Sequence, residues 1–130
     1  MAKNQTKYVD GFVLVVPKNK VADYKKMAAE GARMWKKYGA LEYMECMGED
    51  LVPQEMGGMK PLAFTKMAKA APNETVWFSF IVFKSKKHRN EVNAKVMKEM
   101  SKQMEKYKDV PMPFDMKRMA YGGFKVIVSN

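Results

Sequence analysis

The stretch ETVWFSFIVFKSKKHRNEVNAKVM, residues 74–97, decides how the rest of this chain is expected to fold. Residues 75–83 are a run of β-branched and aromatic residues, which is typical of a buried strand. Alternate side chains of a strand point to opposite faces, and both sets are almost entirely apolar here. Because neither face of such a strand is suited to water, the sequence predicts a covering layer on each side of it.

A helix is predicted directly after this strand. Ser85 stands where an N-cap is favoured, and Pro111 lies beyond the end of the pattern. The apolar residues between them recur at helical spacing: Val92, Val96, Met97, Met100, Met104 and Tyr107. The sequence therefore predicts a strand followed by an amphipathic helix.

The segments on either side supply the other elements. Residues 8–16 and 40–47 read as strands, and a helix capped by Asn19 and ended at Gly39 lies between them. A last strand is expected over residues 119–128. Residues 48–73 are rich in Pro and Gly, and a connection of this length often forms a lid, a binding loop or an intersubunit arm.

The predicted order is βαββαβ, which is the ferredoxin-like α+β arrangement in a single domain spanning residues 1–130. Right-handed crossovers place both helices on one face of a four-stranded antiparallel sheet. The other face would then be a bare apolar patch, larger than monomers normally expose. We therefore expect a homodimer that pairs two open sheet faces, a dimeric α+β barrel.

The composition of the chain indicates where in the cell the protein is expected, but it does not indicate a single function. The formal net charge of +10 suits nucleic acid, acidic surfaces or small anions, although lysines scattered along helices also fit a solvated helix face. The N-terminus lacks the apolar core of a signal peptide, and no apolar run is long enough to span a bilayer. With Cys46 as the single cysteine, we expect a cytoplasmic protein without an internal disulfide or membrane partner.

Basic residues gather at the start of the second helix, where backbone amides and the helix dipole favour an anion. Lys87, His88 and Arg89 lie there, and His88 is the single histidine available for acid–base chemistry. The structural alternative is that these side chains are exposed and that Arg89 pairs with Glu91 or Asp115.

Asp10 is the odd residue in an otherwise apolar strand, so its carboxylate needs a partner. Arg118, before the last strand, is the expected partner in a structural ion pair. The alternative is a pocket in which Asp10, Arg118 and Tyr121 meet and Asp10 or Tyr121 acts as an acid or base. Trp77 is expected in the core or as an aromatic wall of a ligand site.

Four blocks of the chain resemble the DUF1428 family of small bacterial proteins. They are YVDGFVLVVPKNK, GALEYMEC, ETVWFSFIVFKSKKHRNEVNAKVM and MPFDMKRMAYGGFKVIV. The resemblance covers most of the chain and implies a dimeric α+β barrel, but it implies no established reaction and no catalytic residues.

We expect the protein to bind a small anionic or partly apolar molecule. Analogy with other dimeric α+β barrels adds a cofactor-independent oxygenase or isomerase as the enzymatic version. The alternatives are a basic protein associated with nucleic acid, in particular RNA, and a structural dimer without a ligand. The sequence predicts neither a cofactor nor a metal site.

Overall fold

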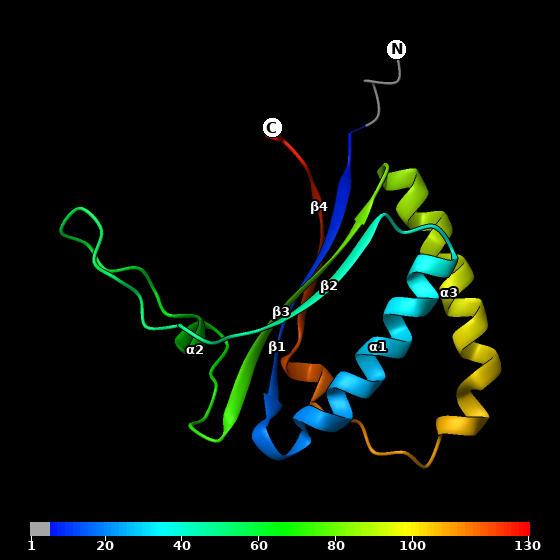
Figure 1. Ribbon diagram of the computed structural model, residues 1–130, viewed down its shortest axis with the longest axis horizontal. Helices are drawn as coiled ribbons and strands as arrows, with labels where there is room; N and C mark the ends of the chain where they lie inside the picture. Colours follow the sequence, from blue (N-terminus) through cyan, green and yellow to red (C-terminus); the bar gives the residue numbers. More distant parts are fainter. Residues whose placement is uncertain (1–5) are drawn as a thin grey trace.

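The structure is a computed structural model that describes residues 6–130. Figure 1 shows a sheet with two long helices on one side and an extended connection on the other. In chain order the elements are β1 (Tyr8–Pro17), η2 (Lys18–Lys20), α1 (Val21–Lys37), β2 (Glu42–Met47), α2 (Phe64–Met67), β3 (Glu74–Phe83), α3 (Lys86–Tyr107), η3 (Met116–Arg118) and β4 (Ala120–Lys125).

The four strands form one sheet in the order β2-β3-β1-β4, and every neighbouring pair is antiparallel. The two ten-residue strands, β1 and β3, lie in the centre and pair along their whole length, with Tyr8 opposite Phe83 and Pro17 opposite Glu74. The predicted βαββαβ order, the α+β class and the antiparallel sheet are confirmed. β4 is shorter than predicted because its pairing with β1 ends at Lys125.

The core lies between the sheet and the helices, where alternate residues of β1 and β3 meet α1 and α3. Burying these side chains removes their apolar surface from water, which is the main force that holds the layers together. One cluster of buried residues comprises Leu14, Val16, Tyr24, Ala28 and Trp77, and a second comprises Ala40, Ile81, Phe83, Val92 and Val96.

Two local predictions about the helices have different outcomes. Ser85 caps α3 as predicted, because its Oγ accepts a hydrogen bond from the His88 amide at 3.1 Å. The predicted Asn19 cap of α1 is wrong, since Asn19 lies within η2 and α1 begins at Val21 without a side-chain cap.

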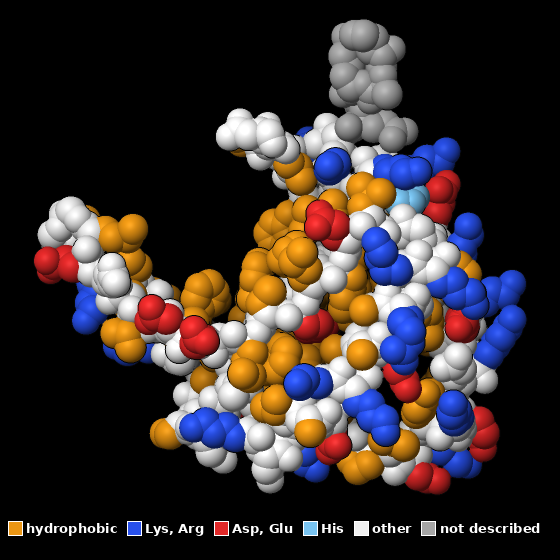
Figure 2. Space-filling view, viewed as in Figure 1, with side chains coloured by type: hydrophobic (Ala, Val, Ile, Leu, Met, Phe, Trp, Pro, Cys, Tyr) orange, Lys and Arg blue, Asp and Glu red, His pale blue; other side chains and the backbone are white. Residues whose placement is uncertain are grey.

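Much of the sheet face that points away from the helices is exposed in the single chain, although Val15 and Val76 at one end of it are buried. Met44 on β2, Phe78 on β3 and Phe124 on β4 expose 45%, 48% and 61% of their surfaces. Figure 2 shows hydrophobic side chains gathered beside the sheet, whereas most Lys and Arg side chains in this view lie over the helices. We call this surface the open face; the homodimer expected to cover it stays a prediction.

None of the helices within residues 6–130 combines the length and the apolar character needed to cross a lipid bilayer.

Two neighbouring residues of α3 test where the core ends. Val96 is completely buried, whereas Met97 is 49% exposed. We expect Val96→Ala to lower the free energy of unfolding by about 2 kcal/mol, because it leaves a cavity in the core. The matched control Met97→Ala should change it by less than about 0.5 kcal/mol. Urea denaturation followed by circular dichroism measures both, and equal losses would contradict this placement of the core.

Candidate functional site

A buried carboxylate organises the polar groups between the sheet and α3. Asp10 is 1% exposed, and its Oδ1 accepts a hydrogen bond from Arg89 Nε at 2.9 Å. Its Oδ2 accepts one from Asn93 Nδ2 at 3.2 Å. Asn93 is held in turn, because its Oδ1 accepts a hydrogen bond from the Trp35 indole nitrogen at 2.9 Å. The carboxylate therefore has a partner on each oxygen, as a buried charge requires.

The predicted structural ion pair of Asp10 exists, but its predicted partner is wrong. Arg118 instead binds Glu74, with its two Nη atoms 2.6 and 2.9 Å from the carboxylate oxygens. The sheet register explains this, since Asp10 lies near the start of β1 whereas Glu74 pairs with Pro17 at its other end.

Arg89 reaches Asp10 because α3 begins immediately after β3. The end of β3 pairs with the start of β1, with Phe83 opposite Tyr8 and Ile81 opposite Asp10. The first turn of α3 is therefore placed over this end of β1. The alternative partners predicted for Arg89, Glu91 and Asp115, are wrong for the same reason.

Glycine and aromatic rings hold the Arg89 side chain in place. The guanidinium lies 5.0 Å from the ring centroid of Tyr8, a cation–π contact. Gly123 lies opposite Asp10 on β4, and a Cβ there would collide with Arg89 and with the Tyr8 hydroxyl. Glycine is therefore needed at this position, because any side chain would displace the ion pair.

Tyr121 joins this cluster from the edge of the sheet. It lies opposite Phe12, and the two rings stack with their centroids 4.9 Å apart. Burial raises the pKa of Tyr121, and the nearby negative charge of Asp10 raises it further. The phenol is therefore protonated at neutral pH. The structure thus brings together three of the residues singled out from the sequence, Asp10, Arg89 and Tyr121.

The remaining candidates lie in other surroundings. His88 accepts a hydrogen bond at Nδ1 from the Lys84 amide at 3.0 Å, and burial, with the charge of Lys84 adding to it, lowers the pKa of His88. Lys87 is exposed at the start of α3. Trp77 is a core residue whose indole donates to Thr75 Oγ1 at 2.9 Å.

A second carboxylate cluster was not predicted from the sequence. Glu45 on β2 accepts hydrogen bonds from the hydroxyls of Tyr24 at 2.8 Å, of Tyr43 at 2.7 Å and of Ser79. Burial raises the pKa values of Tyr24 and Tyr43, and the charge of Glu45 adds to both shifts. The available signal was that Glu45 and Ser79 each interrupt an apolar strand face, and they are directly paired in the sheet.

Gly31 on α1 lies beside this second cluster. A Cβ on Gly31 would lie 3.3 Å from the Tyr43 hydroxyl, so the glycine lets α1 come close to β2. This contact keeps Tyr43 pointing at Glu45 rather than into water.

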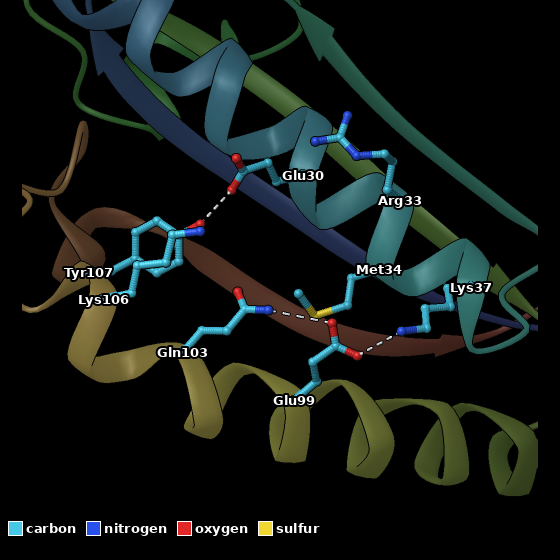
Figure 3. Close-up of a pocket in the computed structure, with 8 residues that line it drawn as sticks. All are labelled: Glu30, Arg33, Met34, Lys37, Glu99, Gln103, Lys106 and Tyr107. Carbon is cyan, nitrogen blue, oxygen red and sulfur yellow. Dashed lines mark hydrogen bonds and ion pairs between the residues drawn. The ribbon is translucent and has the colours of Figure 1, made fainter.

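A hollow of about 250 Å³ lies between α1 and α3 (Figure 3). Its carboxylates already have partners, because Glu30 accepts from the Tyr107 hydroxyl at 3.1 Å and Glu99 pairs with Lys37 at 3.2 Å. Side chains of both helices meet across it: Glu30, Arg33, Met34, Lys37, Glu99, Gln103, Lys106 and Tyr107. The hollow is thus a charged groove between two helices.

A second hollow, of about 210 Å³, is almost wholly apolar and lies in the sheet where β1, β3 and β4 meet. Small residues leave the space open, and Phe78 and Phe124 border it. Its lining comprises Gly11, Phe12, Val13, Phe78, Ala120, Tyr121, Gly122 and Phe124. Alternation along the strands puts the side chains of Phe12 and Tyr121 on the face that carries Asp10, so the sheet separates the hollow from the Asp10 cluster. Neither hollow is lined by Asp10, His88 or Arg118.

The two arginine pairs are expected to contribute unequally to stability. Arg89→Met removes the charged partner of a carboxylate that is 1% exposed, so we expect a loss of about 3 kcal/mol in the free energy of unfolding. The control Arg118→Met breaks a more exposed pair and should cost much less. Urea denaturation at neutral pH compares them, and a larger loss in Arg118→Met would refute the assignment of Arg89 to Asp10.

Comparisons with known proteins show which family this chain belongs to. Residues 7–116 match the model of a family described as "Protein of unknown function (DUF1428)". The chain is 43% identical over 124 residues to the uncharacterized protein YbaA of Escherichia coli K12, covering 95% of this chain and 99% of YbaA. The YbaA proteins of E. coli O157:H7 and Shigella flexneri match with the same identity and coverage. The chain therefore belongs to the DUF1428 family.

Proposed function

We propose that this protein works as a homodimer in which two open faces pack together, and that it binds a small, partly apolar, anionic molecule in the hollow between them. The observation that carries the proposal is the apolar hollow of about 210 Å³ within an uncovered apolar sheet face. In such a dimer the second sheet would roof each hollow and exclude water from it.

The charge distribution supports pairing through this face. Side chains alternate between the two faces of a strand, so every second residue of β1 from Val9 to Val15 belongs to the open face. The residues paired with them on β3 and β4, and the partners of those β3 residues on β2, complete it. In the described strands Glu42 and Glu74 are its charged residues, both lie near its ends, and Glu74 is neutralised by Arg118. A chain of net charge +10 therefore has one broad surface on which two copies meet with little repulsion.

The hollow suits a small ligand for two reasons. Its walls are apolar, as ligand pockets generally are, and glycine and alanine leave room beside the aromatic rings. Tyr121 lies on the other side of the sheet from the hollow, with Asp10 and Arg89, so the charge of that cluster acts on the ligand only through the sheet. An acidic group on the ligand would be favoured by the net charge of +10 of the chain.

The contacts of Asp10 favour binding over catalysis. An oxygenase or isomerase reaction at this site would need a base that reaches the ligand, but both oxygens of Asp10 are engaged by Arg89 and Asn93. The enzymatic version of the proposal therefore relies on Tyr121, the exposed member of the cluster. Nucleic acid stays the alternative partner for the lysine-rich helix side.

Dimerisation through the open face is tested by a pair of substitutions at equally exposed positions. Phe78 on the open face is 48% exposed and Met97 on α3 is 49% exposed. We expect wild type and Met97→Asp to sediment at twice the 15.0 kDa chain mass, and Phe78→Asp to sediment as a monomer, because a charge would be buried in the interface. A dimeric Phe78→Asp with native circular dichroism would refute the pairing.

Ligand binding is tested with benzoate as the probe and amide NMR spectra as the readout. We expect benzoate to shift the signals of Gly11 and Gly122, and the neutral analogue benzyl alcohol to bind several-fold more weakly. Ala120→Phe should abolish these shifts by filling the hollow, whereas the control Ala94→Phe, at an exposed position of α3, should leave them unchanged. Shifts that persist in Ala120→Phe, or that appear only at the groove between α1 and α3, would overturn the assignment.

A further inference from the structure

We infer that residues 48–73, which we call the arm, pack against a second copy of this chain and clasp the dimer. The inference rests on the dimer proposed above and assigns a role to the segment between β2 and β3. Figure 1 shows the arm projecting away from the body, on the side of the sheet opposite the helices. This is the side on which the partner's sheet would lie.

The arm is tied down where it leaves and rejoins the sheet. The Gly48 amide donates to the Val76 carbonyl at 2.7 Å. At the other end, Arg118 Nη2 donates to the Lys69 carbonyl at 2.7 Å while the same side chain binds Glu74. Two fixed ends on β3 restrict the directions in which the arm can extend. The projection is thus a consequence of the fold rather than of a loose chain.

The tip of the arm is a hairpin with its own backbone bonds. Met56 and Met59 exchange both of their backbone hydrogen bonds, at 2.6 and 3.0 Å. Gly57 and Gly58 make the turn between them with φ values of +57° and +80°, which glycine adopts readily. The turn places two methionines side by side at the end of the arm. Unbranched, adaptable side chains of this kind suit a contact surface.

The apolar side chains of the arm have little cover within their own chain. A standard stable interface buries about 800 Å² on each partner, and these side chains together present an area on the order of 800 Å². The exposed fractions are 76% for Val52, 69% for Met56, 76% for Met59, 68% for Leu62, 45% for Phe64 and 53% for Met67. A patch of this size is larger than a monomer normally leaves in water.

Charge favours a second copy of this chain as the occupant. The arm carries three acidic residues, Glu49, Asp50 and Glu55, and three basic ones, Lys60, Lys66 and Lys69. Its net charge is therefore zero, and the rest of the chain carries the whole +10. Because the arm is neutral, it can approach the strongly basic body of a second copy without net repulsion. Two-fold symmetry makes both arms of a dimer bind at once.

Two pairs of methionines provide the test. Met56→Ser combined with Met59→Ser removes the tip contact, and Met97→Ser combined with Met104→Ser is the control on α3. Met56 and Met104 are equally exposed, at 69% and 68%, whereas Met59 at 76% is more exposed than Met97 at 49%. We expect sedimentation equilibrium to give a dimer dissociation constant at least about tenfold higher for the arm variant and within about twofold of wild type for the control.

The outcomes separate the arm from the sheet contact. If the arm variant dimerises like wild type while Phe78→Asp is monomeric, the arm inference is overturned and the sheet pairing stands. If the arm variant is weakened while Phe78→Asp stays dimeric, the sheet pairing fails and the arm contact stands. A monomeric wild type, or an arm that captures only lipid vesicles or other proteins, overturns the inference.

A cross-linking experiment locates the contact. Met59→Cys in a Cys46→Ser background is labelled with benzophenone maleimide, and chains with ¹⁴N and ¹⁵N are mixed before irradiation. We expect cross-links that join chains of different mass, with the acceptor peptide on the partner's open face. Cross-links found only within one chain would refute the clasp.

Discussion

The structure depends on the central strand pair, β1 and β3, which is apolar on both faces along ten paired residues. Water is unfavourable to both faces, so each needs a covering layer. Helices α1 and α3 supply one layer and build the core around residues such as Phe83 and Val96. Within residues 6–130 the other face is covered only in part, since Val15 and Val76 are buried whereas Phe78 and Phe124 are exposed. The difference in cover between the two sheet faces is the physical reason for the proposed dimer and for the proposed contact between the arm and a second copy.

Two carboxylates, those of Asp10 and Glu45, lie in the layer between the sheet and the helices, and each has hydrogen-bond partners there. Asp10 is matched by Arg89 and Asn93, and Glu45 by three hydroxyl groups. A buried carboxylate without such partners would cost several kcal/mol, so these networks constrain how the helices sit on the sheet. The same networks explain why glycine occupies positions 31 and 123. A side chain at Gly31 would crowd the Tyr43 hydroxyl, and one at Gly123 would collide with Arg89.

Much of the fold could be predicted because the signals are local. Apolar alternation and helical spacing gave the order of elements, and the Ser85 cap follows from its own neighbourhood. The partner of Asp10 could not be predicted in this way, since it depends on which residues of distant strands lie opposite one another. Arg118 precedes the strand next to β1, but the register carries it to Glu74. The Glu45 cluster was missed for the same reason, because Tyr24 reaches it from α1.

The sequence by itself determined the α+β class, the antiparallel order of the strands and the apolar character of both sheet faces, since each follows from residue type and spacing along the chain. Only the tertiary structure decided which carboxylate meets which arginine, where the apolar hollow opens beside Tyr121, and that residues 48–73 extend as an arm. These features depend on register and on contacts between segments far apart in the chain, and pattern along the sequence does not specify either.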